Sequence, residues 1–339
     1  MMLFMRRARA GVLAGSVALS LVACGSDPGP EASEPETGVA TSAGFPVEVE
    51  AANGTVTIPA QPARIVSLSP TATESLFAVG AGDQVAAVDD QSDYPEQAPI
   101  TDLSGYQPNL EAIIAYRPDL VVVSDDSPTD VTDGLEAAGV PVLAAPAAKT
   151  FDEAYDQILD IGTATGHLEK AQGVVDGMRT EIEDLIASVP QEAEGAELGV
   201  FHELGPDLYT ASSDTFIGQV YAELGLSNVA DAAAEQSGND YPQLSAEYLI
   251  SADPDLVMLA DAECCDVTPE AAAARPGWDT ISAVRTGAVV LLDEDISSRW
   301  GPRIPLFVEA VVEAIGIARG GETVETEAAG PLATQRPAA

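Results

Sequence analysis

One stretch of this sequence occurs twice. NLEAIIAYRPDLVVV, which starts at Asn109, and SAEYLISADPDLVML, which starts at Ser245, align so that Glu111 falls on Glu247. In each copy a capping residue begins a short helix, a proline ends it, and an Asp-Leu-Val strand follows. A chain that repeats a helix-turn-strand unit far apart in its sequence is expected to build two similar α/β lobes.

A hairpin and a buried strand open the folded part of the chain. VEVEAANGTVTI has two alternating segments joined at Asn53 and Gly54, a strong hairpin signal. ARIVSLSP follows as a buried strand, and Thr71 with Glu74 three residues later fits the capping box of a helix that Gly80 closes. Strands that alternate with helices in this way predict a mainly parallel sheet.

The middle of the chain shows no strand pattern. From Phe151 to Ser188 the apolar residues follow a helical period, which predicts one long helix. Beyond it the alternation of strands and helices returns, and it ends in a helix from about Pro305 to Ala318. The fold class that we expect is α/β, with two lobes of mainly parallel sheet joined by a single long helix. A chain of 339 residues is long enough for two such domains.

The first residues predict export. Three arginines, Arg6, Arg7 and Arg9, precede the apolar run AGVLAGSVALSLVA, which is short for a membrane span. LVAC, ending at Cys24, resembles the lipobox of bacterial lipoproteins, which implies lipidation of Cys24; the alternative is an unlipidated secretory signal. The expected location is extracytoplasmic, with the lipid on Cys24 as the anchor to the cell membrane. The expected divisions are a signal peptide at 1–23, a flexible tether at 24–44, an N-terminal lobe at 45–150, a connecting helix at 151–190, a C-terminal lobe at 191–320 and a disordered tail at 321–339.

Charge excludes one large class of partner. The chain has 14 Lys and Arg against 55 Asp and Glu, a formal net charge of −41. Such a surface repels phosphate backbones, so we expect no nucleic-acid partner. The simplest interpretation of the acidity is solubility.

Residues for catalysis or metal binding are scarce. The adjacent Cys264 and Cys265 are either a vicinal disulfide or two free thiols, because no cluster with metal-ligand spacing accompanies them. The two histidines, His167 and His202, are expected on the surface or in the core. No G-x-S-x-G, P-loop or H-E-x-x-H motif is present. We therefore expect neither an enzyme nor a cofactor, although carboxylate-only catalysis and a purely structural lipoprotein stay open.

The ordered succession of motifs carries a family likeness. The hairpin, RIVSLSPTATESLFAVG, SDYPEQA, the first repeat, LYTASSDTFIGQVYAELGL, the second repeat and GPRI together resemble the periplasmic binding proteins for cobalamin and ferric siderophores. The likeness runs from Phe45 to about Ala318 and implies a monomeric substrate-binding subunit of an ABC importer. It also implies that Glu111 and Glu247 dock onto the two copies of a permease dimer. Compensation of the helix dipole is the alternative reading of both glutamates.

The same resemblance implies a ligand held between the lobes, near strand ends. The predicted contacts are Pro70, Tyr94, Tyr106, Tyr241, Arg299 and Trp300. Tyr106 and Tyr241 each precede a repeat helix, where aromatic rings can stack on a flat chelate, although a tyrosine there can equally be a packing residue. Arg299 and Trp300 are candidates to contact a ligand carboxylate or phosphate, whereas Arg303 can pair with an acid inside its lobe. Cobalamin is the first ligand that we expect, ferric siderophore the second and haem the third; a bare metal ion is not expected.

Overall fold

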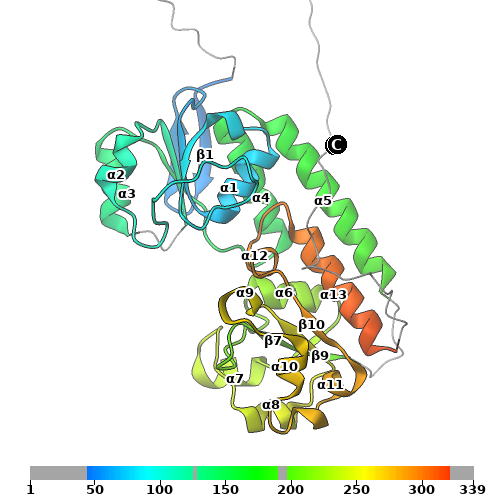
Figure 1. Cartoon of the computed structure of the whole chain (residues 1–339). Helices are drawn as coiled ribbons and strands as arrows, with labels where there is room; N and C mark the ends of the chain where they lie inside the picture. Colours follow the sequence, from blue (N-terminus) through cyan, green and yellow to red (C-terminus); the bar gives the residue numbers. More distant parts are fainter. Residues whose placement is uncertain (1–43, 125–127, 190–196, 321–339) are drawn as a thin grey trace, which may run out of the picture. The chain divides into compact units, whose positions relative to one another are not determined.

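The computed structural model describes residues 44–124, 128–189 and 197–320. The predicted signal peptide with Cys24, the predicted tether up to residue 43 and the predicted tail at 321–339 lie outside these described residues. Figure 1 shows the described elements coloured along the chain. Within the described ranges no helix combines the length and the apolar character needed to cross a membrane.

The N-terminal lobe contains a four-stranded parallel sheet in the order β4-β3-β5-β6. Its strands are β3 (Ile65–Leu68), β4 (Val85–Val88), β5 (Leu120–Val123) and β6 (Val142–Ala144). Alternate residues of β5 serve opposite faces, as the two-residue period of a strand requires. Leu120 and Val122 belong to the core cluster that contains Leu76, while Val121 and Val123 belong to the one that contains Leu135.

Helices cover both faces of this sheet. They are α1 (Pro70–Ala78), the 3₁₀ turn η1 (Gly82–Gln84), α2 (Leu110–Ala115) and α3 (Thr129–Ala137). In Figure 1, α2 and α3 lie on one side of the strands and α1 on the other. Because both faces are covered, every residue of β3 and β5 is buried, as is typical of parallel sheets.

The antiparallel hairpin of β1 (Val47–Ala51) and β2 (Gly54–Ile58) turns one residue earlier than predicted. Ala51 pairs with Gly54, so the turn residues are Ala52 and Asn53. The Asn53 side chain donates to the carbonyl of Val142 at 2.9 Å and accepts from the backbone N–H of Ala144 at 3.2 Å. These bonds attach the turn to the edge strand β6. They could not be predicted from a local pattern in the sequence, because β6 lies far along the chain.

The predicted capping box is wrong. Helix α1 begins at Pro70, and its N-cap is Ser69, whose hydroxyl accepts from the backbone N–H of Ala72 at 3.3 Å. Proline suits the first helical position because it has no N–H to leave unpaired. Glu74 therefore does not cap α1, and its side chain is buried in the protein.

The predicted single long helix is two helices, α4 (Phe151–Thr165) and α5 (Leu168–Ser188). Gly166 ends α4 in the left-handed conformation with φ of 79°, which glycine adopts without strain. A Cβ atom on Gly162 would lie 2.4 Å from that of Ala171, so glycine at this point allows α4 and α5 to approach closely. The helical period alone did not reveal this break.

The C-terminal lobe contains a second four-stranded parallel sheet, in the order β10-β9-β7-β8. Its strands are β7 (Gly199–Glu203), β8 (Ser227–Asn228), β9 (Leu256–Leu259) and β10 (Val289–Leu291). The helical elements are α6 (Phe216–Glu223), α7 (Asp231–Ser237), α8 (Ala246–Ala252), α9 (Ala262–Cys265), α10 (Pro269–Ala273), η2 (Trp278–Thr280), α11 (Ser282–Thr286), α12 (Glu294–Ser298) and α13 (Ile304–Ala318). The α/β class with parallel sheets is thus confirmed.

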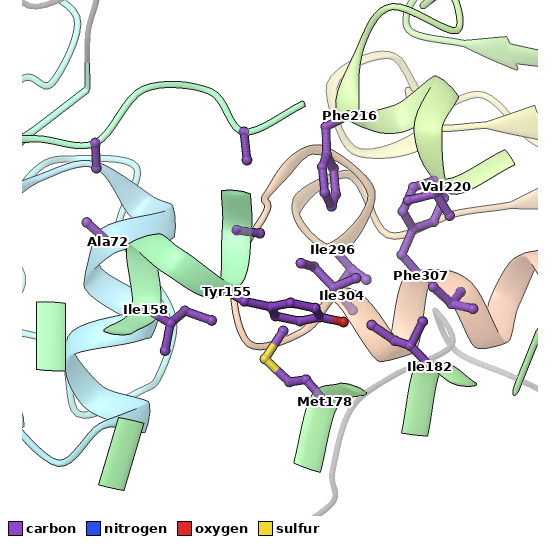
Figure 2. Packing of buried hydrophobic residues seen from close by; sticks show 14 of the residues in the cluster. Ala72, Tyr155, Ile158, Met178, Ile182, Phe216, Val220, Ile296, Ile304 and Phe307 are labelled. Atoms are coloured by element: carbon purple, nitrogen blue, oxygen red, sulfur yellow. The ribbon is translucent and has the colours of Figure 1, made fainter. Parts of the chain in front are cut away.

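One apolar cluster draws on elements of both lobes. Figure 2 shows Tyr155 of α4 packed among Met178 of α5, Phe216 of α6 and Ile304 of α13. Tyr155 is only 3% exposed, and the Arg179 guanidinium lies 4.3 Å from its ring centroid. Elements of the two lobes thus share one apolar core.

Candidate functional site

Four of the eight tyrosines in the chain are substantially exposed. They are Tyr94 (45%), Tyr106 (80%), Tyr209 (47%) and Tyr241 (47%). Tyr94 and Tyr106 lie between β4 and α2, Tyr209 follows β7, and Tyr241 lies between α7 and α8. Tyr94, Tyr106 and Tyr209 therefore stand on segments that leave the carboxyl ends of parallel strands, where α/β sheets bind ligands, whereas Tyr241 stands on the segment that joins two helices.

Tyr209 is the exposed tyrosine that our sequence analysis missed. It lies in LYTASS a few residues after the end of β7, at the same distance along the chain that Tyr94 has from the end of β4. Its carbonyl accepts from the backbone N–H of Leu204 at 2.9 Å. The sequence did contain a signal for Tyr209: like Tyr94, it is an aromatic residue a few positions beyond a buried strand.

Backbone hydrogen bonds hold the Tyr209 and Tyr241 segments together. Thr210 donates to the carbonyl of Pro242 at 3.1 Å, and Ser212 donates to that of Asp240 at 2.9 Å. Burial raises the pKa of Tyr241, and the negative charge of Asp240 raises it further, so the phenol stays neutral at physiological pH. The Tyr241 phenol is thus neutral, and the backbones of both segments are fixed to each other.

A glycine allows the Tyr106 segment to lie against the sheet. A Cβ atom on Gly105 would stand 2.7 Å from a carboxylate oxygen of Asp89 and 3.0 Å from the carbonyl oxygen of Leu68. Leu68 ends β3, and Asp89 follows β4 directly. Pro70, the first residue of α1, lies at the same edge and is partly exposed.

A buried carboxylate joins elements that are far apart in the sequence. Glu74 of α1 is 3% exposed and accepts from Arg299 Nη1 at 3.0 Å. Arg303 donates to both oxygens of Glu74, from Nη2 at 2.6 Å and from Nε at 2.9 Å. Arg299 also donates to the carbonyl of Gln91 at 3.1 Å and pairs with Asp295. We call Glu74, Asp295, Arg299 and Arg303 the arginine cluster.

These contacts change the interpretation of the arginines. Arg303 does pair with an acid of its own lobe, Asp295, at 4.0 Å, but its closer partner at 2.6 Å is Glu74 on α1 of the N-terminal lobe. Arg299 is 9% exposed, and its guanidinium already contacts protein oxygen atoms. The predicted contact of Arg299 with a ligand anion has no support in this geometry, since an anion would have to displace those partners.

The arginine cluster and a second ion pair bring strand-end segments of the two sheets together. Arg303 stacks on Tyr94, with its guanidinium carbon 4.3 Å from the ring centroid. Lys149 Nζ lies 3.9 Å from a carboxylate oxygen of Asp240, the residue before Tyr241. Trp300 is partly buried, and its indole N–H donates to Gln157 of α4 at 3.2 Å. This bond attaches the Trp300 segment, just after Arg299, to α4.

The two repeated glutamates occupy equivalent places. Glu111 is in the first turn of α2, capped by Asn109, and Glu247 is in the first turn of α8, capped by Ser245. Both side chains are exposed, and within the described residues neither forms an ion pair. This geometry suits docking to a partner, and it also suits compensation of a helix dipole.

Another part of the repeat has a structural explanation. The carboxylate of Asp119 accepts from the backbone N–H groups of Ala63 and Arg64, just before β3. Asp255, its repeat equivalent, accepts from the N–H of Gly199 at 2.9 Å, at the start of β7. The repeated aspartate thus fixes the entry of the neighbouring strand in each sheet.

The remaining candidates lie elsewhere. Cys264 and Cys265 form a disulfide in α9, at the carboxyl end of β9. His202 is buried against the hydroxyl of Tyr221 at 2.6 Å, and burial lowers its pKa to about 3, so it is neutral. Within the described ranges no group of three or more His, Cys, Asp or Glu side chains is placed to hold a metal ion.

Comparison with known proteins gives consistent matches. A family model described as periplasmic binding protein matches residues 65–296. The chain is 34% identical over 278 residues to the uncharacterized ABC transporter substrate-binding lipoprotein YvrC of Bacillus subtilis strain 168, covering 80% of this chain and 86% of that protein. It is 33% identical over 267 residues to a cobalamin-binding protein of Halobacterium salinarum, covering 77% and 71%.

A solved structure shares the fold. The crystal structure of a possible iron-binding, periplasmic solute-binding protein from Staphylococcus epidermidis superposes with a TM-score of 0.65 at 29% identity. The match covers 75% of this chain and 99% of that one. Cobalamin and iron thus both appear among the names of similar proteins.

Proposed function

Since the chain belongs to the periplasmic binding protein family, we propose that it captures cobalamin at the strand ends of its two sheets and delivers it to an ABC permease. Proteins of this class bind solutes for ABC importers and are not enzymes. A membrane permease and a small-molecule ligand follow from that class. The identity of the ligand, the docking residues and the lipid anchor are the parts that we propose.

The exposed tyrosines are the observation that carries the ligand class. Tyr94 and Tyr106 stand on a connecting segment of the N-terminal lobe, and Tyr209 and Tyr241 on connecting segments of the C-terminal one. Aromatic rings have large apolar faces and a polar tip, so they bind a flat, partly polar ring system well. Corrin is such a ring system, and the similarity to the cobalamin-binding protein of Halobacterium supports it.

Pro70 and Trp300 complete the proposed pocket. Pro70 is partly exposed beside the Tyr94 and Tyr106 segments, and Trp300 is partly buried against Gln157. Arg299 acts in this proposal through the arginine cluster, by holding the Gln91 segment in place, rather than by touching the ligand. Both arginines thereby position Tyr94, which stacks on Arg303.

Delivery is proposed to use the two repeat helices. Glu111 and Glu247 present one exposed carboxylate each, from equivalent first turns of α2 and α8. Two similar charged points match a permease built from two similar subunits, and charge pairs fix the register of such a complex. Lipid on Cys24 would keep the monomeric protein close to that permease.

Isothermal titration of residues 45–339 tests the ligand. Cyanocobalamin, a panel of ferric siderophores and haem are titrated separately into the same preparation. Tight binding of cyanocobalamin alone supports the proposal. Preference for a ferric chelate would replace cobalamin by the second candidate, which the similarity to the Staphylococcus protein favours. Failure of every chelate to bind would contradict the proposed function itself.

A further inference from the structure

The disulfide between Cys264 and Cys265 joins neighbours in the sequence, and both residues are exposed. A disulfide stabilises a fold largely by closing a loop in the unfolded chain, and the gain is smallest for the shortest loop. Neighbouring residues close the shortest loop, so overall stability does not explain this bond. The disulfide therefore acts locally. It fixes the shape of α9 and the surface that the two sulfur atoms present.

The turn that carries the disulfide is held firmly. Helix α9 starts directly after Asp261, which is fully buried at the end of β9. A carboxylate oxygen of Glu294 in α12 accepts from the backbone N–H of Glu263 at 2.6 Å and of Cys264 at 3.0 Å. Figure 1 shows α9 beside α12. The backbone of the turn is thus fixed to the protein, while its sulfur-bearing side chains remain exposed.

The disulfide turn is linked through α12 to the segment that carries Tyr94. Helix α12 also carries Asp295, which pairs with Arg299, and Arg299 reaches Asp93 at 3.4 Å, next to Tyr94. Burial raises the pKa of Glu263, and the negative charges of Asp293, Glu294 and Asp93 raise it further. Glu294 and Asp295 are neighbours in α12, so the contacts of Glu294 with the turn and of Asp295 with Arg299 link the disulfide turn to the Tyr94 segment.

We propose that the Cys264–Cys265 disulfide forms an apolar wall of the ligand site, against which the unsaturated ring of a metal chelate packs. The inference rests on the proposed function. Glu263 and Asp266 flank the two cysteines in the sequence, and the Glu294 carboxylate accepts from the backbone of the turn; carboxylates are poor surfaces for an unsaturated ring. The disulfide is uncharged and polarisable, and sulfur makes favourable contacts with the edges and faces of unsaturated rings. The bond also prevents rotation that two separate thiols would allow.

The test compares three states of the protein with one ligand. Wild type is titrated with cyanocobalamin when oxidised, and again after reduction by a phosphine that is removed under nitrogen. The variant Cys264→Ser/Cys265→Ser is titrated in parallel. Loss of a well-packed contact should weaken binding by about tenfold or more in the reduced and double-serine proteins. Reoxidation of the reduced protein should restore the affinity. Glu270→Gln, an exposed change in α10, is the matched control and should bind like wild type.

Three outcomes would overturn the inference. Equal affinity in the oxidised, reduced and double-serine proteins would mean that the disulfide does not contact the ligand. Weaker binding accompanied by an equal fall in melting temperature in both altered forms would mean that the bond only supports the fold. If the oxidised wild type bound neither cyanocobalamin nor any ferric chelate, the proposed function would fail first, and that result differs from a loss confined to the altered forms.

Discussion

At the scale of single residues, the exposed tyrosines are the most direct test of the site. Tyr106→Ala, Tyr209→Ala and Tyr241→Ala should each weaken ligand binding by about 1 to 3 kcal/mol, the range for a buried aromatic anchor in a complex. Leu168→Ala is the control, because Leu168 is also apolar and 41% exposed but begins α5. Titration calorimetry measures the ligand dissociation constant of all four variants. Tyrosine variants that bind as tightly as the control would mean that these rings do not contact the ligand.

Asp261 predicts a pH dependence of stability. Its carboxylate is fully buried, and burial, with the charge of Glu203 next, raises its pKa to about 7. A proton bound more tightly in the folded state stabilises that state at low pH, and this stability is lost as the pH rises from about 4 through about 7. Asp261→Asn cannot ionise, so it should be more stable than wild type at alkaline pH by about 1 to 3 kcal/mol, the cost of an unsatisfied buried polar group.

Urea unfolding of Asp261→Asn and wild type at pH values on both sides of this range measures the effect. The Glu203 carboxylate stays paired with Arg275 in both proteins, with both of their contacts at 2.6 Å. The difference in unfolding free energy between the two proteins should therefore shrink toward acid pH. A difference that stays constant with pH would show that Asp261 does not titrate in this window.

At the scale of elements, the repeat helices separate docking from dipole compensation. Glu111→Ala with Glu247→Ala should abolish ligand uptake by cells and leave affinity nearly unchanged, since both carboxylates point to solvent in α2 and α8. Asp130→Ala with Glu270→Ala is the matched control, because these acids also stand exposed in first turns, those of α3 and α10. Uptake that falls equally in both double variants would favour the dipole reading.

The elements also show how far sequence patterns reach. The predicted helix from Pro305 to Ala318 matches α13, which begins one residue earlier, because its apolar period is strong and long. The register of the hairpin and the cap of α1 were missed, since Asn53 bonds to β6 and Ser69 competes with Thr71 as the N-cap. The break between α4 and α5 depends on Gly166, and an isolated glycine in a helical pattern does not by itself announce a stop.

Prediction of the candidate site had a different limit. Sequence order could place Tyr94 beyond a strand, and Tyr106 and Tyr241 each before a repeat helix, where they do lie. It could not show that Arg299 and Arg303 share Glu74, more than two hundred positions away in the chain. This pairing depends on how α1 packs against the segment after β10. A local hydrophobic period in the sequence carries no information about that packing.

At the scale of the whole molecule, the arginine cluster should contribute strongly to stability. Glu74→Gln would leave Arg299 and Arg303, which are 10% and 12% exposed at their side chains, without their shared buried anion. Breaking a buried ion pair from one side costs about 3 to 5 kcal/mol, because the remaining charge stays desolvated. Asp152→Asn breaks the exposed pair with Arg179 and is the control, expected to cost less than about 1 kcal/mol.

Urea unfolding of the two variants compares these costs directly. The cluster joins α1 and the Gln91 segment to the segment between α12 and α13, so its loss should also loosen the loops that carry Tyr94. Hydrogen exchange in the first turns of α1 should therefore quicken in Glu74→Gln and not in Asp152→Asn. Equal unfolding free energies for both variants would mean that the buried charges are solvated in solution, and that packing around Tyr155, rather than the arginine cluster, joins the strand-end loops of the two sheets.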